Sequence, residues 1–425
     1  MLAMSEHWNG YKRENAVLRL GMLGNPIAIP KLIVRANDWV PQVRYAARES
    51  LERLLKSDNA EAFVLSLPDL YHLQDCVRDD HKILISNITN FLISPDNAGY
   101  LKLAIRNENP YIARIAVKLC IENSLIDKQE LVSECLSHSD VIVRNIASNL
   151  LREFTGEVLE LFLKISIKDP FMPIRREAFQ IYLRVIPEKG LEIAEKFLFD
   201  RHISIREIAI KNLLKNNFDV EKVLTNVLSS KDGSVLKIRC AITGLAGIGS
   251  KQSAPEITKL FGNPSPSIRK ASLQALVKIM GDEAKPYLLN GLKDKSPSVA
   301  KESARLLNKL KIKLSAEELL DIVEKSRYNH TLLVCMSSAK NINKWDRLIF
   351  LLSLIGLFAQ KDSAKAGIVE KELTIWDVNF NRSSSYPSNA QIERIGSEYS
   401  KSRLLFSERR RRSIDFTIKG FGISA

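Results

Sequence analysis

One short phrase recurs along most of this chain at nearly constant intervals. It consists of a turn with Pro, Asp, Asn or Ser, then an apolar residue, an arginine and, two or three places later, an alanine. The arginines are Arg13, Arg44, Arg114, Arg144, Arg175, Arg206, Arg239 and Arg269, and Lys82 and Ala300 occupy two degenerate copies. Successive sites are 31, 38, 32, 30, 31, 31, 33, 30 and 31 residues apart. A repeat of this length predicts a stack of similar units, each burying its apolar face against the next.

Each interval contains two helical patterns. After Arg44, apolar or small residues stand at i, i+4, i+7 and i+8, which places them on one helix face: Ala47, Leu51, Leu54 and Leu55. A shorter apolar helix precedes each site, as in residues 130–140, and turns such as Asn109-Pro110 separate the helices. The pattern predicts an all-α solenoid of about ten helix pairs over residues 1–313.

This phrase resembles the HEAT repeat, and especially the bacterial HEAT-like repeats that are grouped with phycobilisome-lyase repeats, from residue 10 to about 310. The resemblance implies that the repeated arginine is structural. It is expected to bind an acidic or turn residue of its own or a neighbouring repeat, and Asp38 before Arg44 and Asp140 before Arg144 fit that role. HEAT proteins serve as scaffolds, adaptors, DNA-repair enzymes and lyases, so the resemblance says more about fold than about function.

After residue 313 the phrase stops but helical patterns continue. Residues 314–380, which begin with a capping box from Ser315 to Glu318, are predicted to form a helical cap that continues the solenoid. Residues 381–425 are predicted to form a loop, a helix that begins near Ser388 and a basic tail.

The tail contains four consecutive arginines, Arg409, Arg410, Arg411 and Arg412. Beyond them Ile414, Phe416 and Ile418 alternate with polar residues, which is the period of a strand. Two interpretations follow: a frayed, solvated terminus, or a basic handle with a short strand that pairs with the edge of a partner's sheet.

The motifs that carry chemistry are missing from this sequence. None of the six histidines is followed by glutamate, and no HExxH, CxxC, GxxxxGK or GxSxG motif occurs. We therefore expect no enzyme activity, metal or cofactor. Two enzymatic relatives stay open as alternatives: a HEAT-like DNA glycosylase that uses Asp38, Trp39 and Tyr45, and a lyase-like chaperone for a tetrapyrrole.

The cysteines and the hydropathy predict a cytoplasmic protein without a transmembrane segment. The five cysteines are scattered and odd in number, as in a reducing compartment. The most apolar run, residues 348–358, is shorter than the roughly 20 residues that cross a bilayer, and is predicted to be a buried helix.

A formal net charge of +14 favours an acidic partner. The second helix of each pair is expected to line the concave face, and residues one, five and nine after the arginine share a stripe on it. In the last five repeats this stripe is mostly basic, although one repeat contributes Cys240, Gly244 and Ile248. Its basic members are Arg176, Arg184, Lys211, Lys215, Lys270, Lys278, Lys301, Arg305 and Lys309.

With the four tail arginines, these residues are the predicted partner-binding site. The chain is then a non-catalytic scaffold for an acidic protein. Alternatively it binds the phosphate backbone of a nucleic acid without sequence preference, because the stripe has few aromatic residues for base stacking. The plain alternative is that these are ordinary solvated lysines and arginines.

Overall fold

The computed structural model describes residues 1–230, 233–382 and 384–423. All regular structure in these residues is helical, which confirms the all-α prediction. The chain divides into two compact units, unit 1 (residues 1–193) and unit 2 (residues 194–425), and each is described by itself. The boundaries predicted near residues 313 and 380 stay predictions.

Unit 1 consists of helix pairs that share one continuous apolar core. In most pairs a shorter helix is followed by a longer one that carries the repeat site. The elements are η1 (Ala3–Glu6), α1 (Gly10–Leu23), α2 (Ile29–Arg35), α3 (Pro41–Arg53), α4 (Ala60–Leu65), α5 (Leu67–His72), α6 (Lys82–Ile93), α7 (Ala98–Ala104), α8 (Pro110–Glu122), α9 (Lys128–Leu136), α10 (Val141–Leu150), α11 (Gly156–Ser166) and α12 (Met172–Val185). Helix α13 (Pro187–Phe197) contains the division between the units.

In the first pair of unit 1, the short 3₁₀ turn η1 takes the place of the shorter helix and packs on α1. Helix α1 ends at Gly24, whose φ of 66° is the left-handed conformation that glycine adopts without strain. A Cβ on Gly21 would lie 2.4 Å from Oγ of Ser50, so glycine at this position lets α1 and α3 pack closely.

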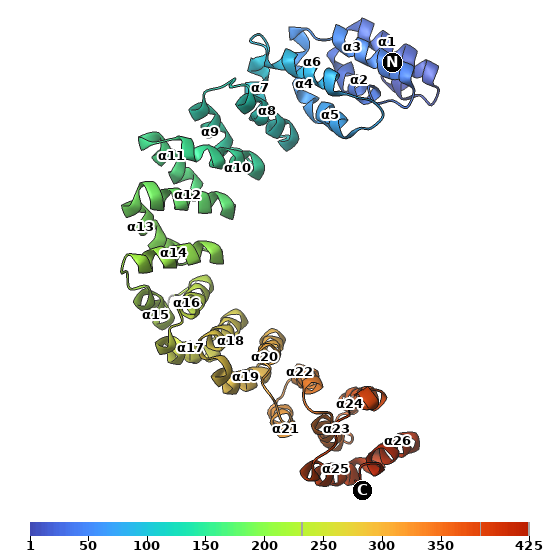
Figure 1. Ribbon diagram of the computed structural model, residues 1–425, viewed down its shortest axis with the longest axis vertical. Helices are drawn as coiled ribbons and strands as arrows, with labels where there is room; N and C mark the ends of the chain where they lie inside the picture. Colours follow the sequence, from blue (N-terminus) through green and yellow to red (C-terminus); the bar gives the residue numbers. More distant parts are fainter. Residues whose placement is uncertain (231–232, 383, 424–425) are drawn as a thin grey trace. The chain divides into compact units, whose positions relative to one another are not determined.

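Unit 2 also consists of helix pairs, each made of a first and a second helix. Its helices are α14 (Ile203–Lys215), α15 (Val220–Ser229), α16 (Val235–Ile248), α17 (Ala254–Lys259), α18 (Pro266–Met280), α19 (Lys285–Leu292), α20 (Pro297–Lys309), α21 (Ala316–Lys325), α22 (Asn329–Ser338), α23 (Lys344–Phe358), α24 (Ser363–Val378), α25 (Asn389–Ser402) and α26 (Glu408–Lys419). Helices α14, α16, α18, α20 and α22 contact one another in that order along one side, and α15, α17, α19 and α21 follow the other side (Figure 1).

Residues beyond 313 form further helix pairs. The predicted capping box at Ser315 is present, and Ser388 with Gln391 forms a second one. The apolar run of residues 348–358 lies in α23, which is largely buried, as predicted. Trp345 at its start packs edge to face against Trp376 of α24 and against Phe421, so aromatic packing joins α23 and α24 to the end of the chain.

Both the frayed terminus and the short strand predicted for the basic tail are wrong for residues 408–419, which form helix α26. The role of the arginines as a basic handle stays a prediction. Ile414 and Ile418 are four residues apart and both buried, whereas Phe416 between them is 85% exposed. Residues 414, 416 and 418 alternate in sequence, but only the first and last share a helix face. The apolar contact of that face, and not the period of two, decides the conformation.

Candidate partner-binding surface

Most repeat arginines connect one repeat to the next. Arg269 on α18 donates from Nε and Nη2 to the carboxylate of Asp294, at 2.7 Å each, and from Nη1 to the backbone carbonyl of Asn263, at 2.7 Å. Arg13 makes the same contacts with Asp38 and with the carbonyls of His7 and Trp8. Each guanidinium thus binds the turn of its own repeat through the backbone and the turn of the following repeat through a carboxylate.

The structure therefore corrects the acidic partners that the sequence suggested. Asp38 binds Arg13, and Arg44 binds Asp79 while donating to the carbonyl of Asp38. In the same way Asp140 binds Arg114, and Arg144 binds Asp169. The reason is geometric: the side chain reaches across to the next turn, and its own turn presents only carbonyl oxygens.

Asp38 is a structural residue and not an available general base. It is buried, and it also accepts hydrogen bonds from Arg35 and from the backbone of Val40. Burial raises the pKa of Asp38, but the hydrogen bonds from Arg13 and Val40 outweigh that effect and leave the pKa below its ordinary value. Asp38 is therefore not available as the catalytic aspartate that the glycosylase alternative requires.

Arg239 is not a member of this set, because the recurring phrase places the repeat site of α16 one residue too late. The second helices begin after equivalent capping residues: His202, Ser234, Ser265, Ser296 and Tyr328. Four residues after the cap stand Arg206, Arg269 and Ala300, but in α16 the residue is Ile238. Arg239 is exposed, whereas Cys240 and Gly244, which the sequence pattern places on the stripe, are buried.

The carboxylate that would form an ion pair with an arginine at position 238 is also absent. Asn263 stands where the following repeat has Asp294, and both side chains cap their turns in the same way. Oδ1 of Asn263 accepts from the backbone N–H of Ser265 at 2.9 Å, and Oδ1 of Asp294 from that of Ser296 at 2.7 Å. Arg239 instead shares a stripe of α16 with the half-buried Thr243 and the exposed Gly247.

With this correction, unit 2 carries one continuous set of cations on its successive second helices. We call it the basic row: Lys211 and Lys215 on α14, Arg239 on α16, Lys270 and Lys278 on α18, and Lys301, Arg305 and Lys309 on α20. All are exposed except Lys270, which is half-buried. Within the described residues none of them except Arg305 forms an ion pair within 4 Å.

Glu302 is a buried carboxylate within the basic row. It accepts a hydrogen bond of 2.6 Å from Gln274 of α18 and two from Arg305 of its own helix. The hydrogen bond from Arg305 lowers the pKa of Glu302, and the charge of Lys270 contributes to the same shift. Glu302 therefore joins α18 to α20 and fixes the position of Arg305, while the neighbouring lysines stay open.

The remaining predicted site residues are on helices other than those of the basic row. Arg176 and Arg184 are exposed on α12 of unit 1. In the tail, Arg410 binds Asp377 at 3.3 Å, so it holds α26 against α24. Arg412 pairs with Glu408 on the surface of α26, and Arg411 is half-buried. Arg409 is exposed.

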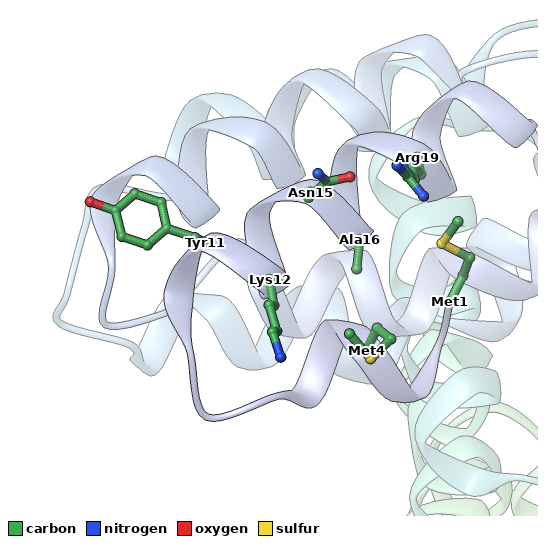
Figure 2. A pocket seen from close by; sticks show the side chains of 7 residues that line it. All are labelled: Met1, Met4, Tyr11, Lys12, Asn15, Ala16 and Arg19. Carbon is green, nitrogen blue, oxygen red and sulfur yellow. The ribbon is translucent and has the colours of Figure 1, made fainter.

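A hollow of about 390 Å³ lies between η1 and α1 in unit 1 (Figure 2). Figure 2 shows two methionines from the first turn facing polar and basic side chains of α1; the lining residues are Met1, Met4, Tyr11, Lys12, Asn15, Ala16 and Arg19. This lining offers no carboxylate, histidine or thiol to act as an acid, base or nucleophile.

Three further features of the described part of the chain bear on its chemistry. It contains no cluster of three or more His, Cys, Asp or Glu that could hold a metal ion. Burial raises the pKa of Cys120 to about 11 and of Cys135 to about 12, so both thiols stay protonated at neutral pH. None of its helices combines the length and apolar character needed to cross a bilayer.

Comparison with protein families decides the type of repeat. Residues 220–308 match the model for HEAT repeats, and this range runs from α15 to α20 and contains most of the basic row. The chain contains HEAT repeats. No curated protein matches the chain.

Two solved HEAT structures are similar to the chain at low sequence identity. One is the complex of CpcE and CpcF of phycocyanin lyase from Nostoc sp. PCC7120, with 14% identity, coverage of 59% of this chain and 95% of that one, and a TM-score of 0.25. The other contains Tumor Overexpressed Gene domain arrays of microtubule polymerases, with 15% identity, coverage of 94% and 99%, and a TM-score of 0.22. These TM-scores are too low for either structure to indicate a partner for this HEAT-repeat chain.

Proposed function

We propose that this HEAT-repeat chain is a non-catalytic scaffold that binds an acidic protein through the basic row of unit 2. The observation that carries the proposal is the register of the row. Four successive second helices present exposed cations at equivalent positions, while most of their apolar residues are buried. Lys278, Lys301 and Lys309 are open to an incoming carboxylate.

An acidic protein fits the row better than a polynucleotide does. Glu207 stands exposed on the same stripe of α14 as Lys211. A phosphate backbone carries negative charge at every step, so it would meet this carboxylate unfavourably. A protein surface can instead place a cation or a neutral residue opposite it. The exposed side chains of the row also include no aromatic group on which a base could stack.

The proposal is tested with a triple charge reversal, Lys270→Glu, Lys278→Glu and Lys301→Glu, in the full chain. The matched control reverses three exposed lysines away from the row, at Lys222, Lys251 and Lys361. Two labelled probes are titrated against each protein: a glutamate-rich peptide of about 20 residues and a random-sequence DNA duplex of equal charge.

We expect the acidic peptide to bind the wild type and the control alike, and to lose at least tenfold in affinity for the row variant. Equal affinity for all three proteins would overturn the proposal. Tighter binding of the duplex, with a steep decrease as salt rises and sensitivity to the same three lysines, would instead establish the nucleic-acid alternative.

A further inference from the structure

Five successive second helices of unit 2, α14, α16, α18, α20 and α22, carry a line of equivalent positions. Counting five residues from each capping residue gives Glu207, Arg239, Lys270, Lys301 and Leu333. The burial pattern supports this register, because residues 299, 300, 302, 303 and 304 of α20 are buried, as are residues 331, 332, 334, 335 and 336 of α22. Three cations in a row are therefore followed, on the next helix, by a leucine.

Leu333 differs in chemistry from the cations before it on the same line, and it is exposed, as Arg239 and Lys301 are. It is 54% exposed, and the other exposed residues of α22, Asn329 and Ser337, are uncharged. Helix α22 packs directly against α20, so Leu333 lies one helix beyond Lys301. A single exposed leucine is ordinary on a protein surface. Here it marks the place where the line changes from basic to apolar.

We propose that the occupant of this line is an extended segment of a partner protein with three acidic residues, spaced three apart, followed three residues later by a large apolar residue. This inference rests on the proposed function and specifies the partner. Packed helices lie about 9 Å apart. A polyproline II segment rises about 3.1 Å per residue with three residues per turn. Every third side chain therefore faces the same way and meets the next helix.

In this arrangement the acidic side chains meet Arg239, Lys270 and Lys301, and the apolar side chain covers Leu333. Charge complementarity positions the segment, because carboxylates in any other register would meet Leu333 or Glu207. Burial of Leu333 against the partner's apolar side chain makes an acidic segment that ends in an apolar residue bind more tightly than one that does not.

The test uses the full chain and the labelled peptide Asp-Ser-Pro-Asp-Ser-Pro-Asp-Ser-Pro-Leu, with binding followed by fluorescence anisotropy. The same peptide in reversed order is included, because the line does not fix the direction of the partner chain. Two peptide controls have one change each: the terminal leucine replaced by serine, and the three aspartates placed consecutively.

On the protein side, Leu333→Ser is compared with Leu404→Ser, which alters an 85% exposed leucine of the same unit away from the line. We expect the leucine peptide to bind the wild type and Leu404→Ser alike, and about tenfold more weakly to Leu333→Ser. The serine peptide should bind all three proteins equally weakly, and the peptide with consecutive aspartates should lose affinity for the wild type.

Two results separate this inference from the proposed function. If the charge reversal at Lys270 and Lys301 abolishes binding but Leu333→Ser binds the leucine and serine peptides as the wild type does, the basic row binds acidic proteins and the apolar terminus is refuted. If the charge reversal leaves acidic peptides unaffected, the proposed function and this inference fail together.

Discussion

Arg269 on α18 and Asp294 in the turn before α20 form two parallel hydrogen bonds of 2.7 Å, and both side chains are largely buried. The same guanidinium occupies carbonyl oxygens of its own turn. One side chain thus connects three segments of the stack, and removal of the arginine leaves an uncompensated carboxylate together with unpaired carbonyls.

We therefore expect Arg269→Ala to lower the free energy of unfolding by about 3 kcal/mol. Arg239→Ala is the matched control, because it removes an arginine from the adjacent repeat that is exposed, and the loss should stay within about 0.5 kcal/mol. Urea titrations followed by circular dichroism measure both values. Equal losses for the two variants would show that Arg239 belongs to the structural set after all.

These two arginines also show what the sequence could and could not predict. The recurring phrase located Arg269 correctly, because its period follows from the stacking of equal units. The phrase misplaced Arg239 by one residue, because an Ile-Arg pair matches the pattern whether the arginine stands fourth or fifth after the helix cap. Ser234 as the capping residue, equivalent to Ser265 and Ser296, is the signal that could have corrected it.

The acidic partners were harder to predict than the arginines. Asp38 lies six residues before Arg44 and 25 after Arg13, and only the packing of successive repeats shows that the longer separation is the contact. Five residues of the basic row on α18 and α20, including Lys270 and Lys301, were predicted from helix periodicity alone. Their binding role stays a prediction.

The ion pair between Arg114 and Asp140 should make stability depend on pH. A hydrogen bond from Arg114 lowers the pKa of Asp140 from 3.8 to about 2 in the folded chain. A depressed folded pKa contributes stability that is complete above the unfolded pKa and is lost as the pH falls toward the folded value. The contribution of this carboxylate therefore disappears between about pH 4 and pH 2.

This pH dependence is measured by thermal unfolding from pH 6 to pH 2 for the wild type and for Asp140→Asn. The variant should be less stable than the wild type at pH 6, and the difference should shrink toward pH 2. Asp96→Asn, at an exposed aspartate, is the control and should follow the wild type throughout. A constant difference between wild type and Asp140→Asn at every pH would contradict the assignment.

The five cysteines provide a probe of the packed state. Cys120, Cys135, Cys240 and Cys335 are buried, and burial raises the pKa of each of these thiols. Cys76 alone is half-buried. We expect one thiol to react with iodoacetamide in the native protein at pH 7.5 and five to react in urea, as counted by intact mass. Rapid native labelling of Cys120 or Cys135 would show that the core of unit 1 opens.

The C-terminal helix supplies the sharpest contrast between neighbouring residues. Ile414 lies on the buried face of α26, and Phe416 two residues later is 85% exposed. Ser413 and Arg410 both bind the carboxylate of Asp377 on α24, at 2.6 Å and 3.3 Å, so this helix is docked by its polar and its apolar contacts together. Ile414→Asp places a charge in the apolar contact and should release the helix.

Trypsin reports the release, because α26 contains four consecutive arginines and a released segment exposes the bonds after them. Cleavage between residues 409 and 413 should be at least tenfold faster in Ile414→Asp than in the wild type, whereas Phe416→Asp should be cleaved at the wild-type rate. A strand would present residues 414, 416 and 418 on one face and make both substitutions equally disruptive. Equal cleavage rates for the two variants would therefore mean that this segment is not held as the helix described here.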